Sequence, residues 1–466
     1  MLPALAQSFS GKFYTEIGKM AVDREFLLGT AEKCHDPFLR CALYGAAQAA
    51  LGVSGCCVLS HAPQGCNMLV NSAFGWQDAD YTETLVLCTK LCEDEIVHGG
   101  EDLLARTILE VRDMNVPIVF VLSSCGPEIV GDDIIAVCED ARSEVDFDVV
   151  PIECAGFRGT QYDGADIALD VLLKRLVVDK GRKIANSVCL IAPFANANPT
   201  WMGDLEWVKG VLSQMGVEEV VTITHQTALN DFKKVSATGA SLVLSHDCGQ
   251  KAADYLASEF GVEQLCRDIP LPVGFTNTKR WLRQLAERFA ATKVADRLIA
   301  EGENRVVEVC RRKGLEQFFM HRAPAAIVAD ATVGIPLVHF ITEDLEMIPQ
   351  LICLRSSQDA ARKILEKELE ELNLSPRVIY AADVYQSKAA LEEIKPEIVI
   401  GSNIEKHAVE EMDIPFSFLL VSPTSRFRLI NREYFGYTGM LNLIEFIQND
   451  WRERYRSQQR RYKARW

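Results

Sequence analysis

Residues 116–134 read VPIVFVLSSCGPEIVGDDI, and this stretch decides the fold class. Its first seven residues form a continuous apolar run, which is typical of a strand covered on both faces of a parallel sheet. The run ends near Cys125, which lies between Ser124 and Gly126, and a helix-like segment follows. Ligands of open α/β sheets bind outside the carboxyl ends of the strands. The stretch therefore predicts a buried parallel strand with a functional position at its end.

The same pattern recurs along almost the whole chain. Further short apolar runs are VSGCCVLSH, ETLVLCT, FDVVPIEC, SVCLIAPF, EEVVTITH, ASLVLSH, AAIVAD, PQLICLRS, RVIYAAD, EIVIGS and FSFLLVS. Longer helix-like segments, such as GGEDLLARTILEVRDM and SQDAARKILEKELEELNL, separate them. This alternation predicts an α/β fold with three consecutive doubly wound, Rossmann-like domains whose sheets are mainly parallel.

The expected domain boundaries follow from breaks in this pattern. We expect an N-terminal domain that carries the candidate cysteines over 1–185, a second domain over 186–320 and a third over 321–466. A linker-like segment lies at 180–187, and the charged segment 301–322 predicts a helix joining the second and third domains. The chain ends in the basic sequence DWRERYRSQQRRYKARW. It predicts a helical tail, either a solvated or subunit-packing end or a docking patch for an acidic partner.

Composition narrows the class of protein. The chain has 466 residues and a formal net charge of −16, which repels phosphate backbones and argues against nucleic acid as a partner. Fifteen cysteines in a chain of this length fit reduced thiols, some of them metal ligands, better than a small disulfide scaffold. No apolar run reaches transmembrane length, and the N-terminal segment lacks a clear signal-peptide layout. We therefore expect a cytoplasmic protein with no membrane partner.

Three cysteines have flanking residues that suit a bulky inorganic group. Cys41 begins the small-residue segment CALYGAAQAALGV, Cys66 ends LSHAPQGC, and Cys125 ends the strand of the opening stretch. Gly65 and Gly126 allow bare backbone to approach a ligand beside them. Iron–sulfur clusters take cysteine thiolates as ligands, so the three thiols together predict three corners of a cluster site. Each cysteine taken alone is equally typical of a buried apolar core.

Other candidate sites have simpler explanations. The segment 93–98, EDEIVH, could hold a metal through carboxylates and a histidine, but an acidic helix N-terminus explains it better. Cys88 and Cys92 lack two further ligands nearby for a structural zinc site. Cys56 and Cys57 are adjacent on an expected strand, so they point to opposite faces and cannot both reach one cluster.

The sequence around the cysteines resembles a known family. RCALYGAAQAALGVSGCCVLSHAPQGC, CTKLCEDEIVHGGEDLL and SSCGPEIVGDDI are similar to successive motifs of the nitrogenase component 1 family. The resemblance continues in PIECAGFRG, PLPVGFTNTKRWLRQLAERF, KPEIVIGSNIEKHAVEEMDIPF and REYFGYTGMLNLIEFI. It therefore covers nearly the whole chain in the right order.

This resemblance implies an oxidoreductase subunit with a shared metal cluster. In the family each subunit gives three cysteines to an interfacial iron–sulfur cluster, either an 8Fe–7S P-cluster or a 4Fe–4S cluster; the matching positions here are Cys41, Cys66 and Cys125. The implied partners are an α-type component 1 subunit, in a heterotetramer, and an ATP-dependent iron protein that supplies electrons. Backbone amides around Gly65 and Gly126 would then tune the cluster potential.

Departures from the family pattern indicate which subunit type this is. Ser245 and Leu420 stand where α-type subunits have the cysteine and the histidine that hold the substrate-reducing cofactor. The resemblance therefore implies a β-type subunit whose cluster relays electrons to a cofactor in the partner. His246 and Cys248 lie beside Ser245, and imidazole and thiolate are soft-metal ligands. A strand-end turn with a buried thiol is the simpler interpretation of both.

The segment CAGFRG separates the chain from dinitrogen-fixing β subunits. Gly156 stands where those subunits carry a serine beside the P-cluster, and GFRG is similar to α-type chains; Cys154 is expected in the strand core. The chain is thus most similar to a nitrogenase-like reductase, with a methylthio-alkane, an organic sulfide, as the expected substrate. Two alternatives stay open. One is a non-catalytic scaffold for assembly of a nitrogenase-type cofactor, and the other is an α/β protein with structural cysteines.

Overall fold

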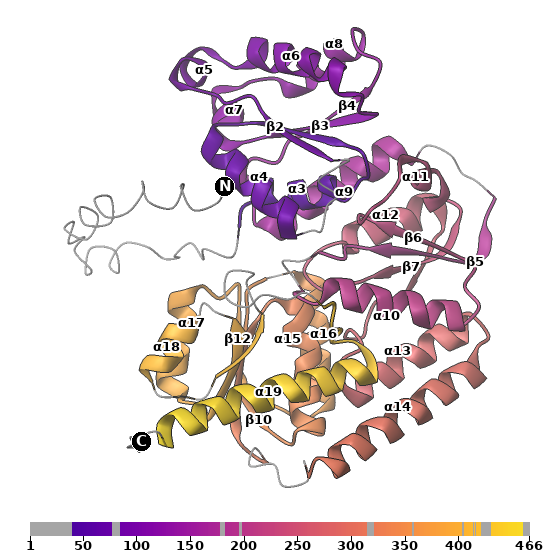
Figure 1. The fold of residues 1–466 in the computed structure, drawn as a ribbon, viewed down its shortest axis with the longest axis vertical. Coiled ribbons are helices and arrows are strands. Elements are labelled where there is room, and N and C mark those ends of the chain that lie inside the picture. The colour runs from indigo at the N-terminus through magenta and orange to yellow at the C-terminus, as the bar shows by residue number, and fades with distance from the viewer. Residues whose placement is uncertain are drawn as a thin grey trace, which may run out of the picture.

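Three parallel sheets organise the molecule (Figure 1). The computed structural model describes residues 40–76, 84–177, 182–194, 198–314, 321–356, 358–402, 405–412, 414, 416–420 and 430–459. Within these ranges the strand orders are β2-β1-β3-β4, β6-β5-β7-β8 and β11-β10-β9-β12-β13. Every pairing between these strands is parallel. The predicted α/β class with three parallel-sheet domains is therefore confirmed, whereas the expected boundaries at 185 and 320 stay predictions.

The first sheet forms because its apolar runs are covered on both faces. Its strands are β1 (Cys57–His61), β2 (Leu85–Cys88), β3 (Ile118–Ser123) and β4 (Asp148–Ile152). The helices around it are α3 (Ala42–Leu51), α4 (Gln64–Trp76), α5 (Glu93–His98), α6 (Glu101–Glu110), α7 (Cys125–Val130), α8 (Ile134–Arg142) and α9 (Gln161–Leu176). Every residue of β1 and β3 is buried, as the continuous apolar runs predicted.

The second and third sheets repeat this plan. The second has β5 (Ile184–Ile191), β6 (Glu219–Ile223), β7 (Thr238–Val243) and β8 (Glu263–Leu265), with α10 (Trp201–Gln214), α11 (Leu229–Val235), α12 (Gln250–Phe260), α13 (Gly274–Arg288) and α14 (Thr292–Arg312). The third has β9 (Pro324–Ala329), β10 (Ile348–Leu354), β11 (Arg377–Tyr380), β12 (Ile398–Ser402) and β13 (Phe416–Leu420), with α15 (Ala331–His339), α16 (Asp359–Glu371), α17 (Val384–Ile394), α18 (Lys406–Glu411) and α19 (Gly436–Gln459). Helix α14 covers much of the segment predicted to join the two domains.

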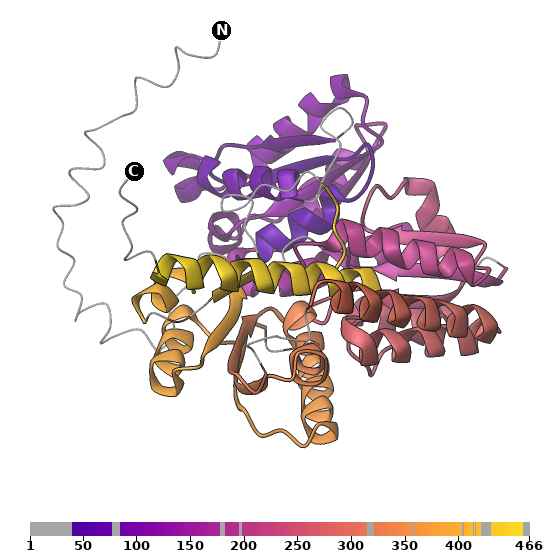
Figure 2. The same ribbon diagram turned by 60° about the horizontal axis from the view of Figure 1, so that its bottom comes forward.

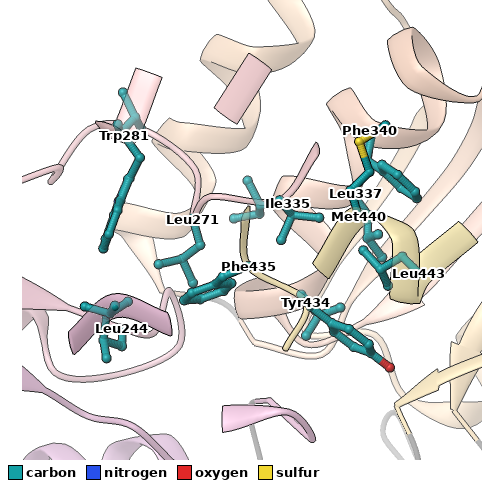
Figure 3. Packing of buried hydrophobic residues seen from close by; sticks show 14 of the residues in the cluster. Leu244, Leu271, Trp281, Ile335, Leu337, Phe340, Tyr434, Phe435, Met440 and Leu443 are labelled. Atoms are coloured by element: carbon teal, nitrogen blue, oxygen red, sulfur yellow. The ribbon is translucent and has the colours of Figure 1, made fainter. Parts of the chain in front are cut away.

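The C-terminal helix α19 ties the second and third domains together. Figure 2 shows it running across both, and it packs against α13 and α14. Met440 and Leu443 of α19, with Tyr434 and Phe435 before it, belong to a core that also contains Trp281 of α13 (Figure 3). The helical tail is therefore present from residue 436 to 459, while the expectations for 1–39 and 460–466 lie outside the described residues.

Helices α3 and α9 pack backbone against backbone in the first domain. A Cβ atom added to Gly45 would lie 1.7 Å from the carbonyl oxygen of Gln161, and one added to Gly164 would lie 1.9 Å from that of Ala42. Glycine at both positions lets the two helices approach to this distance, because it has no side chain. Cys41 directly precedes α3, so this contact also fixes the position of the Cys41 thiol in the first domain.

Asp204 joins the second domain to the third. Its buried carboxylate accepts hydrogen bonds from Asn198 Nδ2 (2.6 Å) and Thr200 Oγ1 (2.8 Å). It also accepts them from the backbone N–H groups of Tyr434 (2.7 Å) and Phe435 (2.8 Å). Burial raises the pKa of Asp204 to about 6 against the lowering effect of these bonds, so the group is ionised at neutral pH and needs all four donors.

We predict that Asp204→Ala destabilises this junction strongly. The change leaves two buried backbone N–H groups without an acceptor, each costing about 1–3 kcal/mol. The free energy of unfolding, measured by urea titration at pH 7, should therefore fall by about 2–6 kcal/mol. Ser213→Ala, at an exposed position of the same helix α10, is the control and should change stability little. A change of equal size in both variants would contradict the role given to Asp204.

Within the described residues, the structure contains no helix with both the length and the apolar character needed to cross a membrane.

Candidate functional site

Cys41 is held at the start of α3 by the segment that precedes α9. It is the N-cap residue of α3 and forms an isolated antiparallel bridge with Thr160. The N–H of Ala42 donates to the carbonyl of Gly159 (3.0 Å), and the N–H of Gln161 donates to that of Arg40 (2.7 Å). The thiol is half-buried. Its position therefore depends on the close packing of α3 with α9.

Cys66 and Cys125 lie at the carboxyl ends of adjacent strands. Cys66 is in the first turn of α4, which follows β1, and Cys125 is the first residue of α7, which follows β3. Ser124 joins the two ends, since its Oγ donates to the carbonyl of His61 at 3.0 Å. Both thiols are half-buried. The structure thus puts these two cysteines at the sheet edge where ligands of open α/β folds bind.

Gly156 lies directly against two of the three thiols. A Cβ atom added there would lie 3.0 Å from Cys125 Sγ and 3.4 Å from Cys41 Sγ. Both sulfurs therefore face one small space, which stays open because residue 156 has no side chain. Gly156 belongs to the 3₁₀ turn Gly156–Arg158, which connects β4 to α9. The resemblance already placed Gly156 at the position of a serine beside the P-cluster, and the structure adds its contact with the thiols of Cys41 and Cys125.

The thiol of Cys66 is close enough to those of Cys41 and Cys125 to interact with them electrostatically. Burial raises the pKa of the Cys66 thiol, and the nearby thiols of Cys125, Cys41 and Cys88 raise it further. Like charges disfavour one another when they converge in a partly buried site, so a positive group beside Cys66 would favour its thiolate form. The structure therefore places the Cys66 thiol in the neighbourhood of Cys41 and Cys125, while the role of the three as cluster ligands stays a prediction.

Cys88 is a fourth thiol in this neighbourhood that sequence reasoning did not place there. It ends β2, the strand next to β1. Its thiol donates to the carbonyl of Ala62 (3.2 Å) and accepts from the N–H of Lys90 (3.3 Å). The signal that could have found it is its position at a strand end, because the ends of neighbouring parallel strands meet at one edge.

The three thiols do not lie close enough to one another to surround a single metal ion. One metal with bonds of about 2.3 Å would draw its sulfur ligands to within about 4 Å of each other. In the described part of the chain, the only group of three ligand atoms within 4.8 Å of one another is His339, Glu368 and Glu371, not the cysteines. Arg280 pairs with both carboxylates, at 3.0 Å from Glu368 and 2.5 Å from Glu371, and His339 also pairs with Glu368. They form an ion-pair network rather than a candidate metal centre.

The two glycines predicted beside the cysteines have different surroundings. A Cβ atom on Gly65 would meet nothing within 4 Å, whereas one on Gly126 would lie 2.8 Å from Ile96 Cδ1. Packing of α7 against α5 therefore accounts for glycine at 126. No atom of the described chain requires glycine at 65, which leaves space for a group from outside the chain. Their role in ligand binding stays a prediction.

Ser245, His246 and Cys248 make contacts within this chain, at and beside the position where α-type subunits have their cofactor-binding cysteine. Ser245 Oγ is hydrogen-bonded to Thr332 Oγ1 (2.9 Å), and His246 Nε2 accepts from the N–H of Leu271 (3.1 Å). Cys248 is 4% exposed and packs in the core of the first two domains. These contacts support the simpler interpretation of a strand-end turn. Leu420 is the last residue of β13 and pairs with Ser402.

The remaining cysteine predictions agree with the structure. Cys154 is fully buried in the core, and its Sγ donates to the carbonyl of Ser123 at 3.5 Å. Cys56 and Cys57 belong to separate cores on opposite faces of the first sheet. Cys92 is exposed and caps α5, so the acidic segment 93–98 is a short helix with its acids in the first turn.

Comparison with known proteins identifies the family of this chain. The family model of nitrogenase component 1 type oxidoreductases matches residues 41–452. The nitrogenase molybdenum–iron protein beta chain of Methanococcus maripaludis is 24% identical over 450 residues, covering 90% of this chain and 95% of that protein. A component of the light-independent protochlorophyllide reductase of Roseiflexus sp. is 24% identical over 427 residues, covering 85% of this chain and 72% of that protein.

A solved structure supports the same placement of the fold. The structure titled "Nitrogenase Cp1 at pH 6.5" superposes with a TM-score of 0.76 at 18% sequence identity, covering 91% of this chain and 94% of that chain. At this identity the match concerns the fold alone. The family model, in contrast, spans the thiol-bearing first domain and both domains that follow. This chain therefore belongs to the nitrogenase component 1 type oxidoreductases.

Proposed function

We propose that this chain is the β-type subunit of a nitrogenase-like, ATP-dependent reductase. Cys41, Cys66 and Cys125 supply three thiolates to an iron–sulfur cluster, of 8Fe–7S or 4Fe–4S type, that is shared with an α-type partner. An ATP-dependent iron protein delivers the electrons, and the substrate is reduced at a cofactor held by the partner. The observation that carries the proposal is that the thiols of Cys41 and Cys125 face one space kept open by Gly156, with the Cys66 thiol close enough to interact electrostatically with both.

The residues around this space suit a cluster. A bound iron–sulfur cluster would supply one-electron transfer at low potential. The chain supplies the thiolates from the carboxyl ends of β1 and β3 and from the start of α3. Gly156 leaves room beside Cys41 and Cys125, and the open side of Gly65 faces no other part of the described chain. Half-burial of the thiols limits access of water while leaving one side for a second subunit.

Exposed apolar side chains around the thiols support a partner subunit on that side. Met68 of α4 is 74% exposed, Ile129 of α7 is 73% exposed, and Val97 of α5 and Phe157 after Gly156 are also exposed. Helices α4, α5 and α7 lie on the same side of the first domain (Figure 1). Apolar residues gathered around a functional site are typical of a protein interface. We call Met68, Val97, Ile129 and Phe157 the apolar rim.

We predict that charges in the apolar rim abolish association with the α-type partner. Met68→Glu combined with Ile129→Glu would place two carboxylates in a desolvated interface, which is costly without a counter-charge. Co-purification of the partner should be lost, while circular dichroism of the chain stays unchanged. Val307→Glu, at an exposed apolar position on the outer helix α14, is the matched control and should leave the complex intact. Retention of the partner by the double variant would contradict the interface.

The substrate assignment is tested by turnover of the complex. Ser245 and Leu420 offer neither thiolate nor imidazole at the positions where α-type subunits hold their cofactor, so the reducing site belongs to the partner. The purified complex with iron protein, ATP and a low-potential reductant should cleave a methylthio-alkane and form no ammonia from dinitrogen. Ammonia formation would refute the substrate class. A cluster-containing complex that consumes no reductant with either substrate would identify a scaffold for cofactor assembly instead.

A further inference from the structure

A carboxylate next to Cys125 organises the turn that carries Gly156. Glu128 lies one turn after Cys125 in α7, and its side chain is 8% exposed. Its Oε1 accepts hydrogen bonds from the N–H of Ala155 (3.0 Å) and from Ser123 Oγ. Its Oε2 accepts from Arg158 Nε at 2.6 Å. A carboxylate can accept about four hydrogen bonds, and three of those of Glu128 come from Ser123, Ala155 and Arg158.

Arg158 completes the arrangement from the other end of the turn. It follows Gly156 by two residues, and its guanidinium also lies 3.6 Å from the carboxylate of Glu153. The hydrogen bond to Glu128 raises the pKa of Arg158, and the two side chains form an ion pair. The bonds to Ala155 and Arg158 bracket Gly156 in the chain. They therefore fix the residue whose Cα faces the sulfurs of Cys41 and Cys125.

The ion pair between Glu128 and Arg158 also places two opposite charges beside the thiols. Glu128 shares a six-residue helix with Cys125. Burial raises the pKa of the nearby Cys154 thiol, and the charge of Glu128 raises it further. The potential of an iron–sulfur cluster depends on nearby charge and on hydrogen bonds. An unpaired carboxylate at this position would stabilise the oxidised state, and an unpaired guanidinium the reduced state.

We propose that Glu128 and Arg158 are positioning residues of the thiol site, which hold Gly156 against Cys41 and Cys125 and keep the charge beside them balanced. The inference rests on the proposed function for its electronic part only. Its geometric part concerns the chain itself and holds without a bound cluster. Neither Glu128 nor Arg158 is proposed as a metal ligand.

The geometric part is tested on the full chain without iron. Alkylation of Cys41 and Cys125 by iodoacetamide, followed by mass spectrometry, should be several-fold faster in Glu128→Ala, because the turn opens more often. Glu128→Gln retains an acceptor for the N–H of Ala155 but loses the ion pair with Arg158, so its rate should lie between those of wild type and Glu128→Ala. The exposed Cys92 is the internal standard and should react equally in all variants. Equal rates at Cys41 and Cys125 in wild type and Glu128→Ala would overturn the positioning role.

The electronic part is tested by potentiometric titration of the complex, followed by electron paramagnetic resonance. Arg158→Gln should shift the midpoint potential to more negative values and Glu128→Gln to more positive values, while the double variant returns toward wild type. Arg377→Gln and Glu393→Gln are matched controls, since that exposed pair in the third domain has the same 2.6 Å contact. Shifts of the same sign in both single variants, or none, would overturn the charge role. Wild-type protein without iron would refute the proposed function but not the alkylation result.

Discussion

Replacing Gly156 by valine should remove the metal cluster from a chain that remains folded. The new Cβ would lie 3.0 Å from Cys125 Sγ and 3.4 Å from Cys41 Sγ, and the two methyl groups beyond it would occupy the space between the thiols. The backbone at 156 does not have a positive φ angle, so an L-residue is allowed there. The expected damage is therefore steric and local to the thiol site.

Iron per chain, measured on the anaerobically purified complex, should fall to background in Gly156→Val. Far-ultraviolet circular dichroism should match that of wild type. Gly210→Val is the matched control, because Gly210 lies on α10 and a Cβ there meets nothing within 4 Å. Full iron content in Gly156→Val would show that the space beside Gly156 is not where the cluster binds.

Gly164→Ala should unfold the packing of α9 on α3, although alanine is the better helix former. In an isolated helix this change stabilises by about 1 kcal/mol. Here the new methyl would lie 1.9 Å from the carbonyl oxygen of Ala42, a backbone atom in the first turn of α3. The helices must move apart to relieve this contact, at a cost of about 3 kcal/mol or more. Cys41, the N-cap of α3, would move with them.

Hydrogen–deuterium exchange should show that the packing between α3 and α9 is lost in Gly164→Ala. Amides of α3 and α9 should exchange much faster in Gly164→Ala, while those of the third domain should keep their protection. Gly210→Ala, in open space on α10, should instead follow helix propensity and gain slightly in stability. Unchanged protection of α3 in Gly164→Ala would contradict the backbone contact on which the position of Cys41 depends.

The parallel sheets were predictable because strands buried on both faces need continuous apolar runs. The run of residues 118–123 became β3, buried throughout, and the acidic cluster at 93–95 became the first turn of α5. Cys66 and Cys125 were predicted beside each other for a related reason, since strand ends meet at one edge. Cys41 was harder to place from local pattern, because it reaches the site through the pairing of α3 with α9 rather than at the end of a strand.

What the sequence did not reveal depends on contacts between distant segments. The resemblance placed Gly156 near the expected cluster, but only the structure shows that the residue leaves space beside the sulfurs of Cys41 and Cys125. Glu128 matters because the turn after β4 folds back onto α7, a contact that periodicity does not encode. Cys88 was considered only for a local zinc motif with Cys92, whereas its thiol contacts Ala62, at the start of the turn that leads to Cys66.

The central claim is that Cys41, Cys66 and Cys125 bind an iron–sulfur cluster, and iron and acid-labile sulfide analysis tests it most directly. The anaerobically purified complex should contain both elements and show a paramagnetic signal at low temperature after reduction or oxidation. The variant with all three cysteines changed to alanine should lack them and remain folded. Wild-type protein without iron, or a triple variant with undiminished iron, would contradict the account.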